Sequence, residues 1–515
     1  MTDRATTQSV RADTPPLYDL LIVGGGINGV GIARDAAGRG YRLLLVEQDD
    51  LASQTSSAST KLIHGGLRYL EYGEFRLVRE SLIERERLWR TAPHIIWPLA
   101  FLMPQNLSTR PAWLVRLGLF IYDHLGGRQK LPGTRTIVLD RSPLGNSLAN
   151  RKGRGFLYSD CWVEDSRLVV LNAMDAAKHG AQIETRTRLL DARREEEIWS
   201  ATIEDAHGVK EVRARILVNA AGPWVADIIA RSGLESQRKV RLVKGSHIVV
   251  PRLHEGDHAL TLQHFDGRII FAIPYEHHFT LVGTTEQEWH DPPGKPHISE
   301  SEIDYLLGVA NRYFARKIAR EDIIWSYSGI RPLYDDQAGN ASAVTRDYVL
   351  DLDSEGAPLL SIFGGKITTY RKLAEQALDL LASQGIETRG AWTATAALPG
   401  GDMPEGNFDI FLHELENQYP ALPHRLLHRL ARAYGTCALK LLDAAETLDD
   451  LGEIFGGDLS RAEVDYLVRE EWAQTAEDIL YRRSKLGLHL TQEASAALAC
   501  YLDHPVSCRS DARNE

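Results

Sequence analysis

Three glycines near the start of the chain, Gly24, Gly26 and Gly29, have the spacing G-x-G-x-x-G. At a strand–turn–helix junction, the first glycine permits the turn, the second lets backbone approach a pyrophosphate, and the third lets the helix pack on the strand. Glu47 can then accept a hydrogen bond from a ribose 2′-hydroxyl, which disfavours NADP. Glycines alone are also typical of a purely structural turn, and the pattern does not separate NAD from FAD.

Three arginines, Arg68, Arg331 and Arg346, stand in sequence contexts that are typical of loops. A guanidinium group binds a phosphate dianion through paired, charge-assisted hydrogen bonds. The chain has 59 lysines and arginines, and most of these pair with surface carboxylates, so context alone favours the surface ion pair for each of the three.

Two further side chains, His247 and Lys366, could take a proton from a substrate hydroxyl. A histidine near its reference pKa of about 6.5 suits a base at neutral pH. A lysine can do the same only if burial or positive neighbours lower its pKa; otherwise it stays charged and stabilises an alkoxide. His247 precedes an apolar Ile-Val-Val run, so a buried structural histidine is the alternative.

The elements around the glycines support the dinucleotide site. Residues 20–23 are apolar and predict a buried parallel strand, residues 28–39 have helical spacing, and residues 41–46 predict the next strand. This is a complete β-α-β unit with Glu47 at the tip of its second strand. The unit is the structural context that a dinucleotide-binding motif requires.

The remaining chain predicts two more kinds of structure. Residues 186–350 alternate apolar and polar side chains, as antiparallel strands do, and residues 407–503 are helical. We therefore predict an α/β fold with a Rossmann-type domain, an antiparallel-sheet substrate domain and a helical C-terminal domain. The expected boundaries are 1–16 for a disordered tail, 17–66, 155–235 and 344–395 for the Rossmann-type domain, 67–154 and 236–343 for the substrate domain, and 396–515 for the helical domain.

Composition excludes several classes of protein. The chain of 515 residues is too long for one core, and its net charge of −11 argues against a nucleic-acid partner. None of the four cysteines forms a C-x-x-C pair, so we expect no metal site and no disulfide framework.

Residues 113–122 are nearly all apolar, with Arg116 among them. They suit a helix in the headgroup layer of a membrane and equally a helix in the core or at a dimer interface.

Four longer segments carry a family resemblance. Residues 55–71, 243–251, 327–333 and 363–371 closely resemble motifs of the FAD-dependent glycerol-3-phosphate dehydrogenases, in particular the aerobic, membrane-associated bacterial enzymes. The likeness runs from residue 18 to about residue 371 and continues more weakly through the helical end. Glu286 is a departure, because aspartate is usual after Gly-Thr-Thr in this family.

The resemblance implies FAD as the cofactor and a fold like that of D-amino-acid oxidase. It further implies that the electrons pass to a membrane quinone. The protein is then expected to be cytoplasmic and attached peripherally to the inner face of the cytoplasmic membrane. We also expect a homodimer. The expected FAD contacts are Gly24, Gly26, Gly29, Glu47, Thr55, Ser56, Ser57, Ser59, Gly222, Gly364, Gly365 and Thr369.

The same resemblance implies oxidation of sn-glycerol 3-phosphate to dihydroxyacetone phosphate by hydride transfer to FAD. His247 is the first choice as base and Lys366 its electrostatic partner, with the division between them left open. Two alternatives remain: an oxidase that passes electrons to oxygen, and a flavoprotein with a non-enzymatic binding role. The expected substrate contacts are Arg68, Tyr69, Thr284, Arg331 and Arg346, and Arg331 is also expected to be catalytic.

Overall fold

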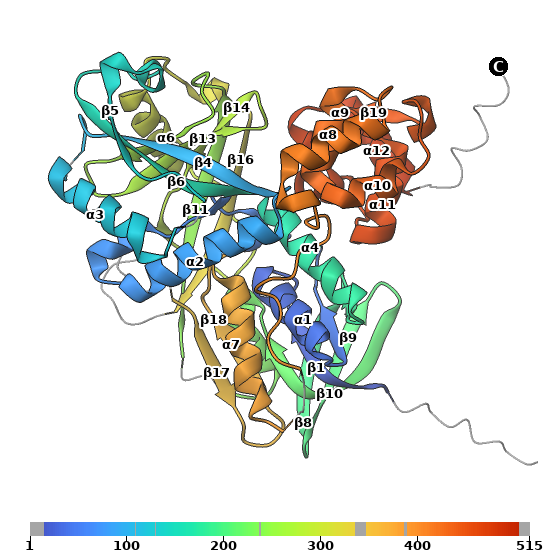
Figure 1. Cartoon of the computed structure of the whole chain (residues 1–515). Coiled ribbons are helices and arrows are strands. Elements are labelled where there is room, and N and C mark those ends of the chain that lie inside the picture. The colour runs from blue at the N-terminus through green and yellow to red at the C-terminus, as the bar shows by residue number, and fades with distance from the viewer. Residues whose placement is uncertain are drawn as a thin grey trace, which may run out of the picture.

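Figure 1 shows the computed structural model of the chain. The tail expected to be disordered, 1–16, lies outside the described residues except for its last two, and Arg346 lies outside them entirely. Among the described residues, none of the helices has the length and apolar character needed to cross a membrane. The structure describes residues 15–108, 110–128, 130–235, 238–334, 347–385 and 389–503.

An eight-stranded sheet contains the predicted β-α-β unit. Its order is β17-β18-β10-β1-β2-β7, and β9 pairs with both β8 and β10. The pairs β1–β10, β1–β2, β10–β18 and β2–β7 are parallel. The strands are β1 (Leu17–Val23), β2 (Leu43–Val46), β7 (Gln182–Glu184), β8 (Arg188–Glu195), β9 (Ile198–Asp205), β10 (Gly208–Asn219), β17 (Val349–Asp353) and β18 (Leu359–Phe363).

Both faces of this sheet are covered, which explains the continuous apolar sequence of β1. Leu20 and Ile22 of β1 belong to one core with α1, α4 and α7, whereas Leu21 and Val23 face a second core with β8, β9 and α5. The helices are α1 (Ile27–Arg39), α4 (Asp165–Lys178), α5 (Val225–Arg231) and α7 (Tyr370–Ala382).

A ten-stranded, mostly antiparallel sheet forms the second layer, as the alternating residues predicted. Its order is β15-β11-β14-β13-β12-β4-β6-β3, with β16 paired to β11 and β5 to β6. Helix α6 (Glu300–Tyr313) packs on one face, and α2 (Phe75–Thr91) and α3 (Ala112–Leu125) pack on the other. The strands are β3 (Leu62–Ile63), β4 (Ile96–Pro104), β5 (Arg135–Val138), β6 (Arg154–Val163), β11 (Val240–Pro251), β12 (Ala259–Gln263), β13 (Ile269–Tyr275), β14 (Phe279–Gly283), β15 (Gln287–Glu288) and β16 (Trp325–Tyr334).

Two strands belong to a different sheet from the one that the boundaries expected from sequence imply. The boundaries at 66 and 155 assign β3 and nearly all of β6 to the Rossmann-type domain, whereas both strands pair within the ten-stranded sheet. The physical reason is that β6 pairs with β4 along nine residues of that sheet, from Val163 to Gly155. Pairing between distant segments leaves no local trace in the sequence.

The C-terminal helices have a hydrophobic core of their own and lie to one side in Figure 1. Buried ion pairs join them to the eight-stranded part: Arg167 of α4 pairs with Glu471, and Asp50 accepts two hydrogen bonds of 2.8 Å from Arg483. Asp50 precedes the loop that lines the cavity described below, so the helical domain holds this loop in place. The elements are α8 (Phe408–Gln418), α9 (His424–Tyr434), α10 (Ala438–Leu442), α11 (Arg461–Glu471), α12 (Gln492–Asp503) and the hairpin β19 (Ile454–Gly456) and β20 (Leu459–Ser460).

Candidate active site

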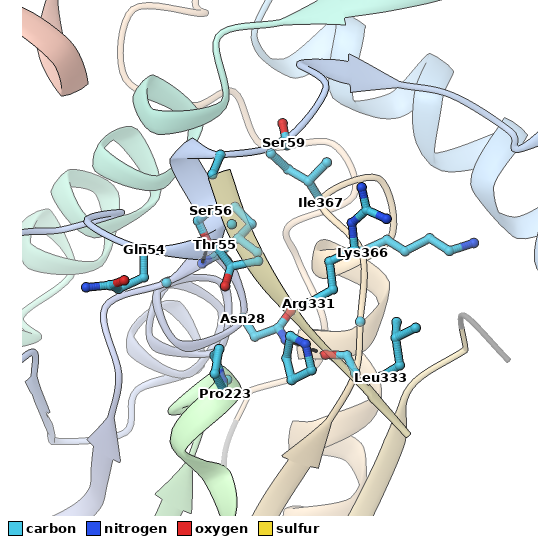
Figure 2. A pocket seen from close by; sticks show the side chains of 18 of the residues that line it. Asn28, Gln54, Thr55, Ser56, Ser59, Pro223, Arg331, Leu333, Lys366 and Ile367 are labelled. Carbon is cyan, nitrogen blue, oxygen red and sulfur yellow. Dashed lines mark hydrogen bonds between the residues drawn. The ribbon is translucent and has the colours of Figure 1, made fainter. Parts of the chain in front are cut away.

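A cavity opens at the carboxyl ends of β1, β2 and β10 and extends to the ten-stranded sheet. Ligands bind at this end of the strands in open α/β sheets. In Figure 2, Gln54, Thr55 and Ser56 lie to one side of the cavity, and Lys366 and Leu333 lie to the other. The cavity thus brings the first glycine motif and the last one into one site.

The glycine turn has the backbone geometry that the motif predicted. Gly24 has a φ of +115°, and a Cβ there would lie 2.5 Å from the carbonyl oxygen of Ala220. A Cβ on Gly29 would lie 1.9 Å from the carbonyl oxygen of Gly24, which explains why the helix can pack so closely on the turn. Gly26 precedes the first residue of α1 and has no side chain to cap it. The start of α1 lines the cavity, and the amide of Ile27 donates to the Ser56 hydroxyl there at 3.0 Å. A helix N-terminus in this position suits a pyrophosphate.

Glu47 lies beside this turn and lines the cavity. Its carboxylate accepts hydrogen bonds from the amides of Gly25 at 2.6 Å and Asp49 at 2.9 Å. Burial is the largest cause of a pKa raised to about 7, and it outweighs these two hydrogen bonds, which lower the pKa. The carboxylate has lone pairs left for a ribose hydroxyl.

Most of the expected cofactor contacts line the cavity, and three do not. Gly29 supports the turn from behind, the Ser57 hydroxyl donates to the carbonyl of Gln54, and Thr369 is buried at the start of α7. Asn28 donates to the carbonyl of Gly364 at 3.1 Å, so the first and last glycine motifs are hydrogen-bonded to each other. The expected contacts that do line the cavity are Gly24, Gly26, Glu47, Thr55, Ser56, Ser59, Gly222, Gly364 and Gly365.

The cofactor fits this set of residues. A Cβ on Gly24 or Gly29 would collide with neighbouring backbone, so both glycines are needed for the tight turn that lies at one end of the cavity. Thr55 donates to the carbonyl of Ile330 at 2.6 Å, which joins the Ser/Thr-rich loop to β16. The cavity therefore has one end at the glycine turn, where a pyrophosphate would fit, and another end at the ten-stranded sheet.

The predicted arginines Arg68 and Arg331 both line the end of the cavity at the ten-stranded sheet, together with Tyr69 and Thr284. Arg331 Nη2 donates to Thr284 Oγ1 at 3.0 Å. Gly245 leaves the space that Arg331 occupies, because a Cβ there would lie 2.5 Å from Nη2. Two guanidinium groups that share one pocket can bind a dianion such as phosphate.

Lys366 lines the same end of the cavity. His247 does not line the cavity but lies behind Thr60, which does. The Lys366 ammonium is 3.8 Å from the centre of the Tyr69 ring. His247 is fully buried, and its Nε2 is 3.0 Å from the hydroxyl of Thr60, which does line the cavity. Desolvation, then Arg331 and Lys61, lower the pKa of His247 well below its usual value. The ring is therefore neutral at neutral pH, and among the described residues Thr60 is the hydrogen-bond partner that links it to the cavity.

The cavity is also lined by residues that were not expected from sequence, among them His64, Thr60 and Glu286. His64 and Thr60 belong to the segment 55–71 that carried the resemblance, so their position beside Arg68 was the available signal. The only signal for Glu286 was its departure from the family pattern.

Comparison with known proteins gives two matches to family models and several close relatives. Residues 19–371 match FAD dependent oxidoreductase, and residues 391–503 match the C-terminal domain of alpha-glycerophosphate oxidase. The D-erythritol 1-phosphate dehydrogenase of Brucella abortus is 53% identical and covers 95% of this chain and 98% of its own. The glycerol-3-phosphate dehydrogenase of Pseudomonas aeruginosa is also 53% identical, over 95% and 96%. The structure of the Bacillus halodurans glycerol-3-phosphate dehydrogenase complexed with FAD has a TM-score of 0.73 and 26% identity, over 95% and 94% of the two chains.

Proposed function

The chain belongs to the FAD dependent oxidoreductase family, and from this premise we propose that it oxidises sn-glycerol 3-phosphate to dihydroxyacetone phosphate. FAD is its cofactor and, when bound, accepts the hydride. The observation that carries the proposal is the meeting of Arg68 and Arg331 in the cavity into which the glycine turn opens. An anionic alcohol held by these arginines lies in the same cavity as the cofactor.

The residues of this chain perform three tasks in that reaction. Arg68 and Arg331 bind the phosphate through charge-assisted hydrogen bonds. His247 takes the hydroxyl proton by way of Thr60, whose hydroxyl gives its own proton to the imidazole Nε2 as it receives one from the substrate. The ammonium of Lys366 stabilises the negative charge that develops on the substrate oxygen.

A second candidate substrate is D-erythritol 1-phosphate. The Brucella relative named for it is as similar to this chain as the Pseudomonas glycerol-3-phosphate dehydrogenase is. Anaerobic mixing of the yellow protein with either phosphate ester tests both, because substrate oxidation bleaches the flavin absorbance near 450 nm on the order of seconds or faster. Faster bleaching by erythritol phosphate would change the substrate and keep the reaction class; no bleaching by either ester would contradict the proposal.

The electrons are proposed to pass to a membrane quinone, and the alternative acceptor is oxygen. The two acceptors are distinguished by measuring hydrogen peroxide during turnover in air, with and without a soluble quinone. A quinone-linked enzyme turns over faster with quinone and forms little peroxide.

Glu47 is expected to make FAD binding pH-dependent. Burial raises its pKa to about 7, and a ribose hydroxyl that donates to the carboxylate favours the ionised form. FAD binding therefore releases a proton from Glu47 below this pH. Titration of apoprotein with FAD, followed by flavin fluorescence, should show constant affinity above about pH 7 and a fall of up to about tenfold per pH unit below it. Glu47→Gln should remove this dependence; if wild type and variant show the same pH profile, Glu47 does not contact the ribose.

We propose that α3 attaches the protein to the inner face of the cytoplasmic membrane. Trp113 is 69% exposed and Phe120 is 52% exposed, and Leu114 and Leu117 of the same helix are also exposed. In Figure 1, α3 lies at the edge of the molecule, on the side away from the C-terminal helices. Large apolar side chains at one surface suit the headgroup layer of a bilayer.

The double substitution Trp113→Asp and Phe120→Asp should release the protein from membranes. Each aromatic side chain contributes about 1.5–3 kcal/mol when buried, so the bound fraction should fall at least about tenfold. Sedimentation with phosphatidylglycerol vesicles measures it. Val209→Asp is the control, because Val209 is 61% exposed on β10 of the other sheet. Equal sedimentation of all three proteins would show that α3 does not hold the membrane.

A further inference from the structure

Glu286 stands between the two arginines that share the cavity. Its Oε1 is 3.6 Å from Nη1 of Arg331, and its Oε2 is 4.0 Å from Nη1 of Arg68. Each carboxylate oxygen thus faces a different guanidinium group. The Glu286 side chain is 13% exposed, so water screens these attractions only weakly.

A phosphate bound by both arginines would occupy the position of the Glu286 carboxylate. A phosphate dianion drawn between Arg68 and Arg331 would come close to the Glu286 carboxylate, and like charges at such a distance repel. The carboxylate and the phosphate therefore compete for the same two cations.

Arg331 is also held by contacts other than Glu286. Its Nη2 is bonded to Thr284 Oγ1 at 3.0 Å, and the missing side chain of Gly245 gives it room. The backbone that carries Glu286 is anchored separately, because the neighbouring Thr285 hydroxyl donates to Glu302 at 2.6 Å and accepts from the amide of Ser246 at 2.9 Å. Removal of the Glu286 charge should therefore leave both the arginine and the loop in position.

We propose that the Glu286 carboxylate pairs with Arg68 and Arg331 when no substrate is bound, and that the substrate phosphate displaces it from both arginines. We call this the placeholder role of Glu286. The inference rests on the proposed function, in which these arginines bind a phosphate ester. It has two consequences. Every anion must displace Glu286 before it binds, so free phosphate occupies the site poorly. After the reaction, the carboxylate returns to the arginines and helps the product leave.

The test is direct binding of inorganic phosphate to the FAD-loaded protein, measured by calorimetry at low ionic strength. Glu286→Gln should bind phosphate on the order of tenfold more tightly than wild type, since charge interactions at such distances shift equilibria by about one to three powers of ten. Glu288→Gln is the matched control, because Glu288 lies two residues further on, pairs with Arg241 and does not line the cavity. It should bind phosphate as wild type does. The flavin absorbance spectrum of each variant reports that the site is intact.

The outcomes separate the inference from the proposed function. Unchanged or weaker phosphate binding by Glu286→Gln overturns the placeholder role, and weaker binding would assign Glu286 to orienting the arginines instead. The variant Arg331→Met tests whether the pocket of Arg68 and Arg331 is the anion site. Loss of phosphate binding in that variant supports the arginine pocket as the anion site, whereas binding equal to wild type overturns both that pocket and the inference built on it. Slower release of product by Glu286→Gln, seen as a lower kcat with an unchanged rate of flavin reduction, is the second expected result.

Discussion

Replacement of Arg331 by methionine should lower kcat/KM for glycerol 3-phosphate by roughly 30- to 5000-fold, because removal of one partner from a desolvated, hydrogen-bonded charge pair costs about 2–5 kcal/mol. The Arg331 side chain is 24% exposed and is fixed by Thr284, so its charge is both shielded from water and pre-oriented. Methionine keeps much of the volume and removes the charge. The measurement is the dependence of anaerobic flavin bleaching on substrate concentration.

Two controls make this result specific to the phosphate. Arg193→Met removes an arginine whose side chain is 79% exposed, and it should leave the kinetics unchanged. Glycerol, which lacks the phosphate, is expected to be a poor substrate of both wild type and Arg331→Met, with similar rates. A variant that bleaches normally with glycerol 3-phosphate would show that the phosphate binds elsewhere.

His247→Ala should lower the rate of flavin reduction by about 10²- to 10⁴-fold, the usual contribution of a positioned base, with the flavin still bound. The histidine acts through Thr60, its link to the cavity. Thr60→Val should therefore cause a similar loss, and the double variant should lose little more than either single one. Stopped-flow absorbance at saturating substrate measures the step directly.

The pH dependence gives an independent check of the same base. Burial, Arg331 and Lys61 lower the pKa of His247 well below its usual value. A base must be unprotonated to act, so the reduction rate should stay constant from neutral pH down through about 6.5, where an ordinary histidine would begin to lose activity. If His247→Ala is reduced at the wild-type rate while Lys366→Met is not, the base is Lys366.

The flavin end of the site was largely predictable because its constraints are local. The first strand, the glycine turn and the following helix occupy 23 consecutive residues, Leu17–Arg39. Gly24 needs a positive φ, and Gly29 needs its helix to approach the turn. Requirements of this kind act between neighbours in the chain, so residue type and spacing express them directly.

The substrate end was predictable only as a set of candidates. Arg68 and Arg331 could be named from their loops and from the family motifs, but their approach to each other depends on how the two sheets meet. The same holds for His247, whose place behind Thr60 follows from the pairing of β11 with β14 and β16. The type of a residue limits the chemistry that it can perform, whereas the packing of the two sheets determines which groups its side chain contacts.

By itself the sequence determined the dinucleotide-binding unit, the alternation that builds the antiparallel sheet, and the helical character of residues 407–503, since each depends on the periodic burial of side chains close together in the chain. Only the tertiary structure decided that β3 and β6 join the ten-stranded sheet, that Arg483 binds Asp50 just before the loop that lines the cavity, and that Glu286 lies between two arginines. These are contacts between segments far apart in the chain, and their free energy comes from pairing, burial and charge that exist only once the segments have met.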